Sequence, residues 1–143
     1  HGKQPIWSND RTYCIVYNGE IYNYQAIRSE LLNTGYHFST GTDTEVVVNA
    51  IHCWGIEKAL SKFIGMFAFA LWNEKEKILY LCRDRTGIKP LYYHLGRNIF
   101  LFASEMKSIL AHPHFEKELN LNALAQYFVS GYFFGRLSLR YHI

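Results

Sequence analysis

The stretch Met66-Phe67-Ala68-Phe69-Ala70-Leu71-Trp72 decides the fold that this sequence predicts. Successive side chains of a β-strand point to opposite faces, so its odd-numbered residues share one face and its even-numbered residues share the other. Both sets are apolar, and a strand of this kind has to be covered on both sides. We therefore expect a central strand whose sheet carries helices on one face and a second sheet on the other.

Upstream of this strand, the sequence predicts a first strand and three helices. Tyr13–Tyr17 is rich in β-forming residues, and Asn18-Gly19 is typical of a tight turn that ends such a strand. The helices are expected from Asn23 to Gly35, from Thr42 or Asp43 to about Trp54, and from Ile56 to about Ile64. A strand-like stretch, Tyr36–Ser39, separates the first helix from the second.

Downstream of it, hairpin strands come first and helices follow. The polar loop Asn73–Lys77 leads into a strand at Ile78–Cys82, and Gly96-Arg97 joins two further strands. Those two are Leu91–His94 and Ile99–Phe102, and the helices after them are Glu105–Ala111, capped by Ser104, and Leu121–Phe128, capped by Asn120. Nothing alternates regularly between strand and helix, so the fold class is α+β rather than a doubly wound sheet.

Composition excludes several classes of protein. The 143 residues are 49% hydrophobic and 19% charged, which is globular rather than disordered. The net charge of +3 is spread among acids, so neither nucleic acid nor a membrane surface is an expected partner. No apolar run approaches the roughly 20 residues that span a bilayer. Cys14, Cys53 and Cys82 lie far apart without a C-x-x-C, which indicates reduced, buried thiols in a cytoplasmic protein.

Asn18-Gly19-Glu20 has two interpretations, which the residues alone leave open. It can simply turn the chain. Alternatively, it can bind a ligand, because a carboxylate accepts hydrogen bonds from an ammonium group. The Asn side-chain amide and the Gly N–H are also two donors suited to an oxyanion.

Two other polar stretches are candidate sites, although ordinary structural roles explain them. In Thr42-Asp43-Thr44-Glu45 the acids suit the N-cap and first turn of a helix, and the residues themselves favour that interpretation. Arg83–Pro90 is either an internal network of ion pairs or a contact with a partner domain. His112 and His114 lack a third ligand at a useful spacing, so no metal site is expected.

Several segments occur together in one known family, in the same order. They resemble the glutaminase domain of glutamine-hydrolysing asparagine synthetases, which is a class II glutamine amidotransferase. The resemblance runs from about residue 2 to about residue 133. The segments are Gln4–Ile6, Tyr17–Tyr24, Thr42–Val46, Gly65–Trp72, Arg83–Tyr93 and Ala103–Lys107.

The resemblance implies a fold, a mechanism and a set of site residues. The fold is the four-layer αββα sandwich of N-terminal-nucleophile hydrolases. A cysteine at the mature N-terminus attacks the glutamine side-chain amide, and its own α-amine serves as the base. Asn18 and Gly19 would form the oxyanion hole, and Asn18, Gly19, Glu20 and Asp43 would bind glutamine, with the last three at its α-amino end. The implied domain is residues 1–133, with a divergent tail at 134–143.

The sequence also departs from the family pattern. The family begins with Cys-Gly-Ile, followed by several dozen residues that include an arginine for the glutamine carboxylate. Residue 1 here is His, and the three cysteines lie inside predicted strands or helices. We therefore expect a domain that is incomplete at its N-terminus and inactive as this fragment. The Ser-Gly-Gly-Leu-Asp-Ser phosphate loop is missing too, so ATP and magnesium are expected only in an absent synthetase domain, and no cofactor in this one.

The expected partners are glutamine and the synthetase domain of the full-length enzyme, with a homodimer possible. Two alternatives stand beside the asparagine synthetase interpretation. The chain could be a non-catalytic module that binds glutamine or a partner protein. It could instead be another class II amidotransferase, passing ammonia to a sugar or nucleotide precursor. Arg83–Tyr93 and Ser104–Lys107 look more like the synthetase branch.

Overall fold

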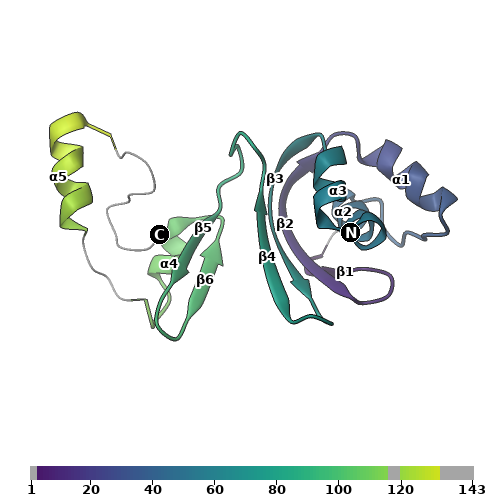
Figure 1. Cartoon of the computed structure of the whole chain (residues 1–143), viewed down its shortest axis with the longest axis horizontal. Helices are drawn as coiled ribbons and strands as arrows, with labels where there is room; N and C mark the ends of the chain where they lie inside the picture. Colours follow the sequence, from purple (N-terminus) through teal and green to yellow (C-terminus); the bar gives the residue numbers. More distant parts are fainter. Residues whose placement is uncertain (1–2, 116–119, 133–143) are drawn as a thin grey trace. The chain divides into compact units, whose positions relative to one another are not determined.

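The computed structural model describes residues 3–115 and 120–132, and it consists of two compact units (Figure 1). Unit 1 is His1–Pro90 and unit 2 is Leu91–Ile143. The tail expected at 134–143 lies outside the described residues. Unit 1 contains every residue proposed above for glutamine binding.

A four-stranded antiparallel sheet forms the centre of unit 1. Its strands lie in the order β1 (Ile6–Trp7), β2 (Tyr13–Ile21), β3 (Gly65–Asn73) and β4 (Ile78–Arg83). The longest ladder joins β2 to β3, from Tyr13 opposite Asn73 to Ile21 opposite Gly65. The strand predicted as central, β3, is indeed paired on both sides.

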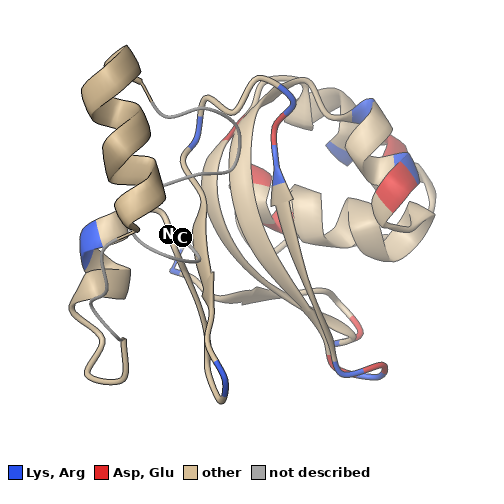
Figure 2. Cartoon of the chain, turned by 60° about the vertical axis from the view of Figure 1, so that its left-hand side comes forward, with Lys and Arg blue, Asp and Glu red and all other residues tan. Residues whose placement is uncertain are grey.

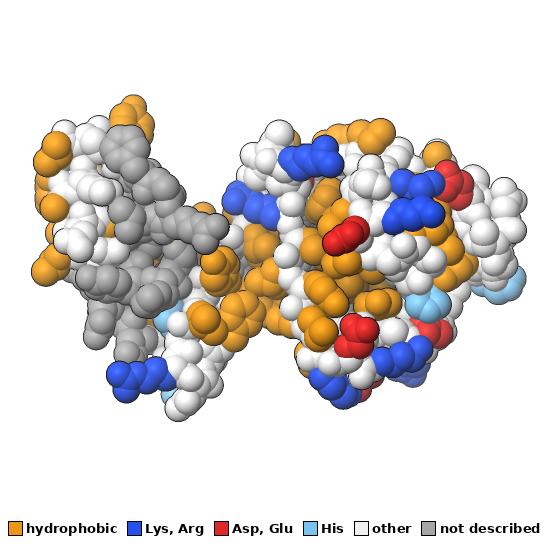
Figure 3. Space-filling model, in the orientation of Figure 1, with side chains coloured by type: hydrophobic (Ala, Val, Ile, Leu, Met, Phe, Trp, Pro, Cys, Tyr) orange, Lys and Arg blue, Asp and Glu red, His pale blue; other side chains and the backbone are white. Residues whose placement is uncertain are grey.

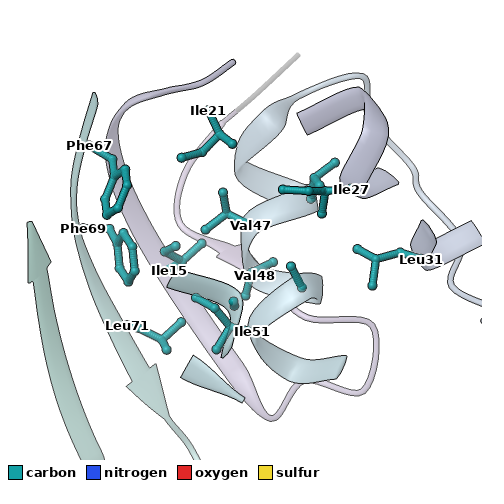
Figure 4. Packing of buried hydrophobic residues seen from close by; sticks show 13 residues of the cluster. Ile15, Ile21, Ile27, Leu31, Val47, Val48, Ile51, Phe67, Phe69 and Leu71 are labelled. Carbon is teal, nitrogen blue, oxygen red and sulfur yellow. The ribbon is translucent and has the colours of Figure 1, made fainter. Parts of the chain in front are cut away.

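Three helices cover one face of this sheet (Figure 1). They are α1 (Tyr24–Asn33), α2 (Asp43–Trp54) and α3 (Ile56–Lys62). Apolar side chains of β2 and β3 meet those of α2 in the core, where Ile15, Val47 and Leu71 are fully buried (Figure 4). Burying side chains of this size contributes about 1.5–3 kcal/mol each. The predicted layer of helices over the sheet is confirmed.

The turn predicted at Asn18-Gly19 is wrong. β2 continues through both residues to Ile21, and Gly19 lies in the ladder opposite Phe67 with a φ of 155°. Glycine permits this backbone conformation because it has no Cβ. The Asn-Gly pair therefore lies within β2, and the next residue, Glu20, continues the strand instead of following a turn.

Two further local predictions are wrong. Tyr36–Ser39 forms no strand; the N–H of Tyr36 donates to Leu31 O at 3.1 Å and that of Ser39 to Glu45 Oε1 at 2.8 Å. Asn23 does not cap α1 through its side chain. Its amide instead links two other segments, donating to Lys62 O at 2.9 Å and accepting from Ile64 N at 3.0 Å.

Unit 2 contains a hairpin and two helices. The hairpin pairs β5 (Tyr92–Leu95) with β6 (Phe100–Ala103), and α4 (Met106–Leu110) and α5 (Leu121–Ser130) follow. Asn120 caps α5 as predicted, accepting from Ala123 N at 3.1 Å, whereas the N-cap of α4 is Glu105 rather than Ser104. Hydrophobic side chains of α5 reach the surface (Figure 3). No helix in the described ranges is long and apolar enough to cross a membrane.

Candidate functional site

The site predicted from the sequence centres on the second half of β2. Strand alternation places Tyr17 and Ile21 on the face that carries the helices, and Asn18 and Glu20 on the opposite face. Asn18 is half-buried and Glu20 is exposed. Over residues 3–115 and 120–132, no hydrogen bond or ion pair is recorded for either side chain, so both can meet a ligand.

The edge of β2 facing away from β3 is occupied on both sides of Gly19. Before it, the Gln4 side chain acts like a short neighbouring strand: Tyr17 N donates to Gln4 Oε1 at 2.5 Å, and Gln4 Nε2 donates to Tyr17 O at 2.8 Å. After it, Ile21 N donates to Asp43 Oδ2 at 3.0 Å. Each of these groups lies on a residue two positions from Gly19, and backbone groups two positions apart point to the same edge.

The Gly19 N–H points to this same edge. Phe67, its partner in the ladder, has turned both backbone groups the other way: Phe67 N donates to Asp84 Oδ2 at 3.2 Å, and Phe67 O accepts from Asp84 N at 2.8 Å. Gly19 and Phe67 therefore exchange no hydrogen bonds. The Gly19 N–H lies between the Gln4 amide and the Asp43 carboxylate, and no side chain of the described residues accepts from it. It is a donor available to an oxygen atom.

Asp43, the first residue of α2, reaches across to β2. Its Oδ2 accepts from the Tyr17 hydroxyl at 3.0 Å as well as from Ile21 N. Burial, the charge of Asp43 and its hydrogen bond, and the charge of Glu20 all raise the pKa of Tyr17. Asp43 contacts this hydroxyl directly, whereas Glu20, on the opposite face of β2, acts on it only through its charge. In the described part of the chain neither Asp43 nor Glu20 has a lysine, arginine or histidine nitrogen within 4.0 Å.

Thr42, not Asp43, is the N-cap of α2. Its hydroxyl accepts from Glu45 N at 3.4 Å, which leaves the Asp43 carboxylate free to turn toward β2. The buried Glu45 carboxylate accepts from Ser39 N at 2.8 Å, from Thr40 N at 2.7 Å and from Thr40 Oγ1 at 2.6 Å. Glu45 therefore fixes the loop that leads into Asp43, a role that the sequence did not reveal.

Asp84 organises the charged loop Arg83–Pro90. Burial alone would raise its pKa, but hydrogen bonds from Thr86 and from the backbone N–H groups of Ile88, Lys89 and Phe67 outweigh this and hold its pKa well below the ordinary range. The Arg83 guanidinium donates to Gly87 O at 2.6 Å and to Lys89 O at 2.7 Å. No ion pair is recorded within this loop, whose residues are all described, so the first of the two interpretations, an ion-pair network, is wrong and hydrogen bonds hold the loop. The second, a contact with a partner domain, stays a prediction.

None of the cysteines is placed to act as a nucleophile with a free α-amine. Cys14 lies in β2, Cys53 in α2 and Cys82 in β4, and none of the three is in a disulfide. Burial raises the pKa of Cys14 and raises that of Cys82 to about 11. No group of three histidine, cysteine or acidic side chains in the described residues could hold a metal ion. Over the helices of unit 1, acidic and basic residues are interspersed rather than gathered into separate patches (Figure 2).

The sequence matches the family model of the glutamine amidotransferase domain over residues 1–139. The chain belongs to this family. It is 46% identical over 127 residues to asparagine synthetase [glutamine-hydrolyzing] 1 of Bacillus subtilis, covering 89% of this chain and 20% of that protein. It is 41% identical over 133 residues to asparagine synthetase [glutamine-hydrolyzing] 3 of the same organism, covering 91% of this chain and 21% of that protein. This amidotransferase domain thus spans about a fifth of the length of these relatives.

Solved structures show the same fold. The glutamine phosphoribosylpyrophosphate amidotransferase of B. subtilis matches with a TM-score of 0.64 and 26% identity, covering 74% of this chain and 25% of that one. A structure described as the allosteric regulatory enzyme of purine biosynthesis matches with a TM-score of 0.65 and 25% identity, covering 74% and 24%. The amidotransferase domain therefore has the α+β fold of N-terminal-nucleophile amidotransferases, which confirms the predicted fold class.

Proposed function

We propose that this amidotransferase domain is the glutaminase part of a glutamine-hydrolysing asparagine synthetase, and that its pocket is built around Asn18, Gly19, Glu20 and Asp43. The names and the 39–46% identities of its Bacillus relatives support the enzyme class. The ammonia would pass to an aspartyl-adenylate made with ATP and magnesium in the synthetase domain of the longer enzyme.

The observation that carries the glutamine pocket is a pair of uncompensated carboxylates beside a free backbone N–H. Asp43 is bonded to the end of β2 at Ile21, one residue after Glu20, and no cation among the described residues neutralises either carboxylate. An ammonium group is the natural partner for two such carboxylates. The Gly19 N–H and the Asn18 amide are donors for the oxygen that becomes negative when a thiol attacks the glutamine side chain.

The attacking thiol is not one of the three cysteines of this chain. The nitrogens of Cys14, Cys53 and Cys82 are peptide amides, and an amide nitrogen cannot serve as the base that activates a neighbouring thiol. We therefore propose that these 143 residues bind glutamine without hydrolysing it. In the complete enzyme, an N-terminal cysteine would supply both the thiol and the amine.

Titration calorimetry with L-glutamine tests this proposal on the 143-residue chain. We expect binding to the wild type, weakened about 10- to 100-fold by Asp43→Asn and by Glu20→Gln, because each removes a charged hydrogen-bond acceptor. Glu57→Gln is the matched control, since Glu57 is an exposed acid in the first turn of α3 and lies outside the pocket. Absence of binding to the wild type, or unchanged binding by both pocket variants, would contradict the pocket.

An ammonia-release assay on the same chain tests the missing nucleophile. The expected rate is that of the buffer. Hydrolysis that persists after Cys14, Cys53 and Cys82 are all replaced by serine would show that another group supplies the chemistry. Hydrolysis that disappears in that triple variant would show that one of the three thiols is competent after all.

The structural likeness to a phosphoribosylpyrophosphate amidotransferase favours a second candidate, an amidotransferase with another ammonia acceptor. It is weaker, because the identity is 26% there and 46% to an asparagine synthetase. Both candidates require the same glutamine pocket. They are separated by assaying the full-length product for asparagine formation from aspartate.

A further inference from the structure

We propose that Tyr17 is a positioning residue for glutamine recognition, acting through Asp43. Its hydroxyl and the Ile21 N–H hold one oxygen of the Asp43 carboxylate, so that the other oxygen is presented to the ammonium group of the ligand. This inference rests on the proposed function, because it takes the ligand at Asp43 to carry an ammonium group.

The two donors converge on one atom. The Tyr17 hydroxyl lies 3.0 Å from Asp43 Oδ2, and the Ile21 N lies 3.0 Å from the same oxygen. The described residues place no hydrogen-bond donor on Asp43 Oδ1. A carboxylate held at one oxygen by two donors cannot rotate freely about its last side-chain bond, and its second oxygen therefore keeps a fixed direction.

Tyr17 is itself held at both ends. Its backbone N–H and C=O are paired with the Gln4 side-chain amide. Its ring is half-buried on the helix face of the sheet and lies against Phe69, with ring centroids 6.5 Å apart and an interplanar angle of 32°. The hydroxyl thus reaches Asp43 from a fixed ring, whereas a surface side chain would lose rotamer freedom on making the same bond.

The hydroxyl also stays protonated, and so a donor, at neutral pH. Burial and the neighbouring charges of Asp43 and Glu20 raise the pKa of Tyr17 above its ordinary value. A phenol that remains protonated donates to a carboxylate, whereas a phenolate would repel it. Tyr17 is therefore the donor of this hydrogen bond, and Asp43 is its acceptor.

The consequence is specificity for the α-ammonium group. Without the Tyr17 hydroxyl, Asp43 keeps only the Ile21 N–H and can turn its charge away from the ligand. Binding of L-glutamine should then weaken, while binding of 4-carbamoylbutanoate, which has the same amide and carboxylate but no ammonium group, should stay the same. A purely structural role of Tyr17 would weaken both ligands alike.

The test compares the two ligands by calorimetry on wild type, Tyr17→Phe and Asp43→Asn. We expect the preference of the wild type for L-glutamine to fall about 3- to 10-fold in Tyr17→Phe, which is the size of one ordinary hydrogen bond, and further in Asp43→Asn. Tyr80→Phe is the control: Tyr80 lies on the same face of the sheet, and no hydrogen bond of its hydroxyl is recorded in the described part of the chain. An unchanged preference in Tyr17→Phe, or equal weakening of both ligands, overturns the proposal.

Amide hydrogen exchange of the ligand-free chain separates this proposal from the proposed function. If Tyr17 orients Asp43, the Ile21 amide should exchange about 10-fold faster in Tyr17→Phe, because its acceptor is no longer held in place. The Tyr22 amide, which donates to Ile64 O at 2.7 Å, should not change. An unchanged Ile21 rate overturns the positioning role even where glutamine binds. If the Ile21 amide exchanges faster in Tyr17→Phe but the chain binds no glutamine, the positioning of Asp43 is supported. Only the assignment of glutamine as its ligand then fails.

Discussion

Gly19 lies so close to Phe67 across the ladder between β2 and β3 that only a glycine fits. A Cβ on Gly19 would lie 2.6 Å from the Phe67 Cα and 2.2 Å from the Met66 carbonyl oxygen. Both neighbours are backbone atoms, which cannot move aside without breaking the ladder. The same residue carries the N–H that we assign to the oxyanion, so the close approach and the donor depend on one position.

Gly19→Ala should therefore be severely destabilising. We expect a loss of about 3 kcal/mol or more in the free energy of unfolding, since both the backbone conformation and the contact are unfavourable. Urea unfolding followed by circular dichroism measures it. Gly41→Ala is the control, because nothing lies within 4 Å of a Cβ there. Equal stabilities of the two variants would contradict the close approach.

Gln4→Ala should loosen the edge of β2 beside the site. The variant loses both hydrogen bonds to the Tyr17 backbone and should cost about 1 kcal/mol, with faster hydrogen exchange of the Tyr17 amide. Lys3→Ala, at the preceding exposed residue, should change neither quantity. Unaltered protection of the Tyr17 amide in Gln4→Ala would show that the Gln4 side chain does not hold this edge in solution.

Asp84→Asn should change how stability depends on pH. Because the pKa of Asp84 is lowered in the folded state, its stabilising effect is fully present above the unfolded value of about 4 and is lost as the pH falls through the folded value. The wild type should exceed the variant in Tm by more than about 5 °C at pH 6. This difference should be constant between pH 5 and 7 and should shrink below pH 4. A difference that does not change on acidification would argue against the lowered pKa.

Cys82 should react slowly with iodoacetamide in the native protein. With a pKa of about 11, only about one thiol in a thousand is ionised at pH 8, and the thiolate is the reactive form. Mass spectrometry after timed alkylation should show modification at least about 10-fold slower than in guanidinium chloride. Equal rates under the two conditions would mean that burial does not protect this thiol.

Much of the fold could be predicted because apolar residues recur at regular spacings and because particular residues mark where helices begin and end. The two apolar faces of β3 indicated a covered central strand, and α2 begins after Thr42 and ends before Gly55, as its caps predicted. The turn at Asn18-Gly19 could not be judged locally, since pairing with β3 keeps this segment extended. Tyr36–Ser39 looked strand-like, but the Glu45 side chain accepts from the Ser39 N–H, a group that a neighbouring strand would otherwise have bonded.

For the candidate site, the residues alone left a binding role of Asn18-Gly19-Glu20 open, and the family resemblance added Asp43. Asn18, Gly19, Glu20 and Asp43 were named, and the structure places Asp43 beside the strand that carries the other three, while their roles remain predictions. The hydrogen bonds that hold these residues in place were not predicted. Gln4 reaches Tyr17 across 13 positions and Tyr17 reaches Asp43 across 26, and no local pattern in the sequence marks contacts at such distances.

The glycine contacts between β2 and β3 also fix which residue of one strand faces which residue of the other. A Cβ on Gly65 would lie 2.1 Å from the Glu20 carbonyl oxygen, so both strands are pinched at the same end of the ladder. A slip by a single position would turn Asn18 and Glu20 into the core and Ile21 out to solvent. The slip would also bring residues that have a Cβ to the positions of Gly19 and Gly65, where the backbone of the other strand leaves no room for one. Gly19 and Gly65 therefore disfavour the misaligned sheet, and the alignment of the proposed pocket depends on two residues that have no side chain.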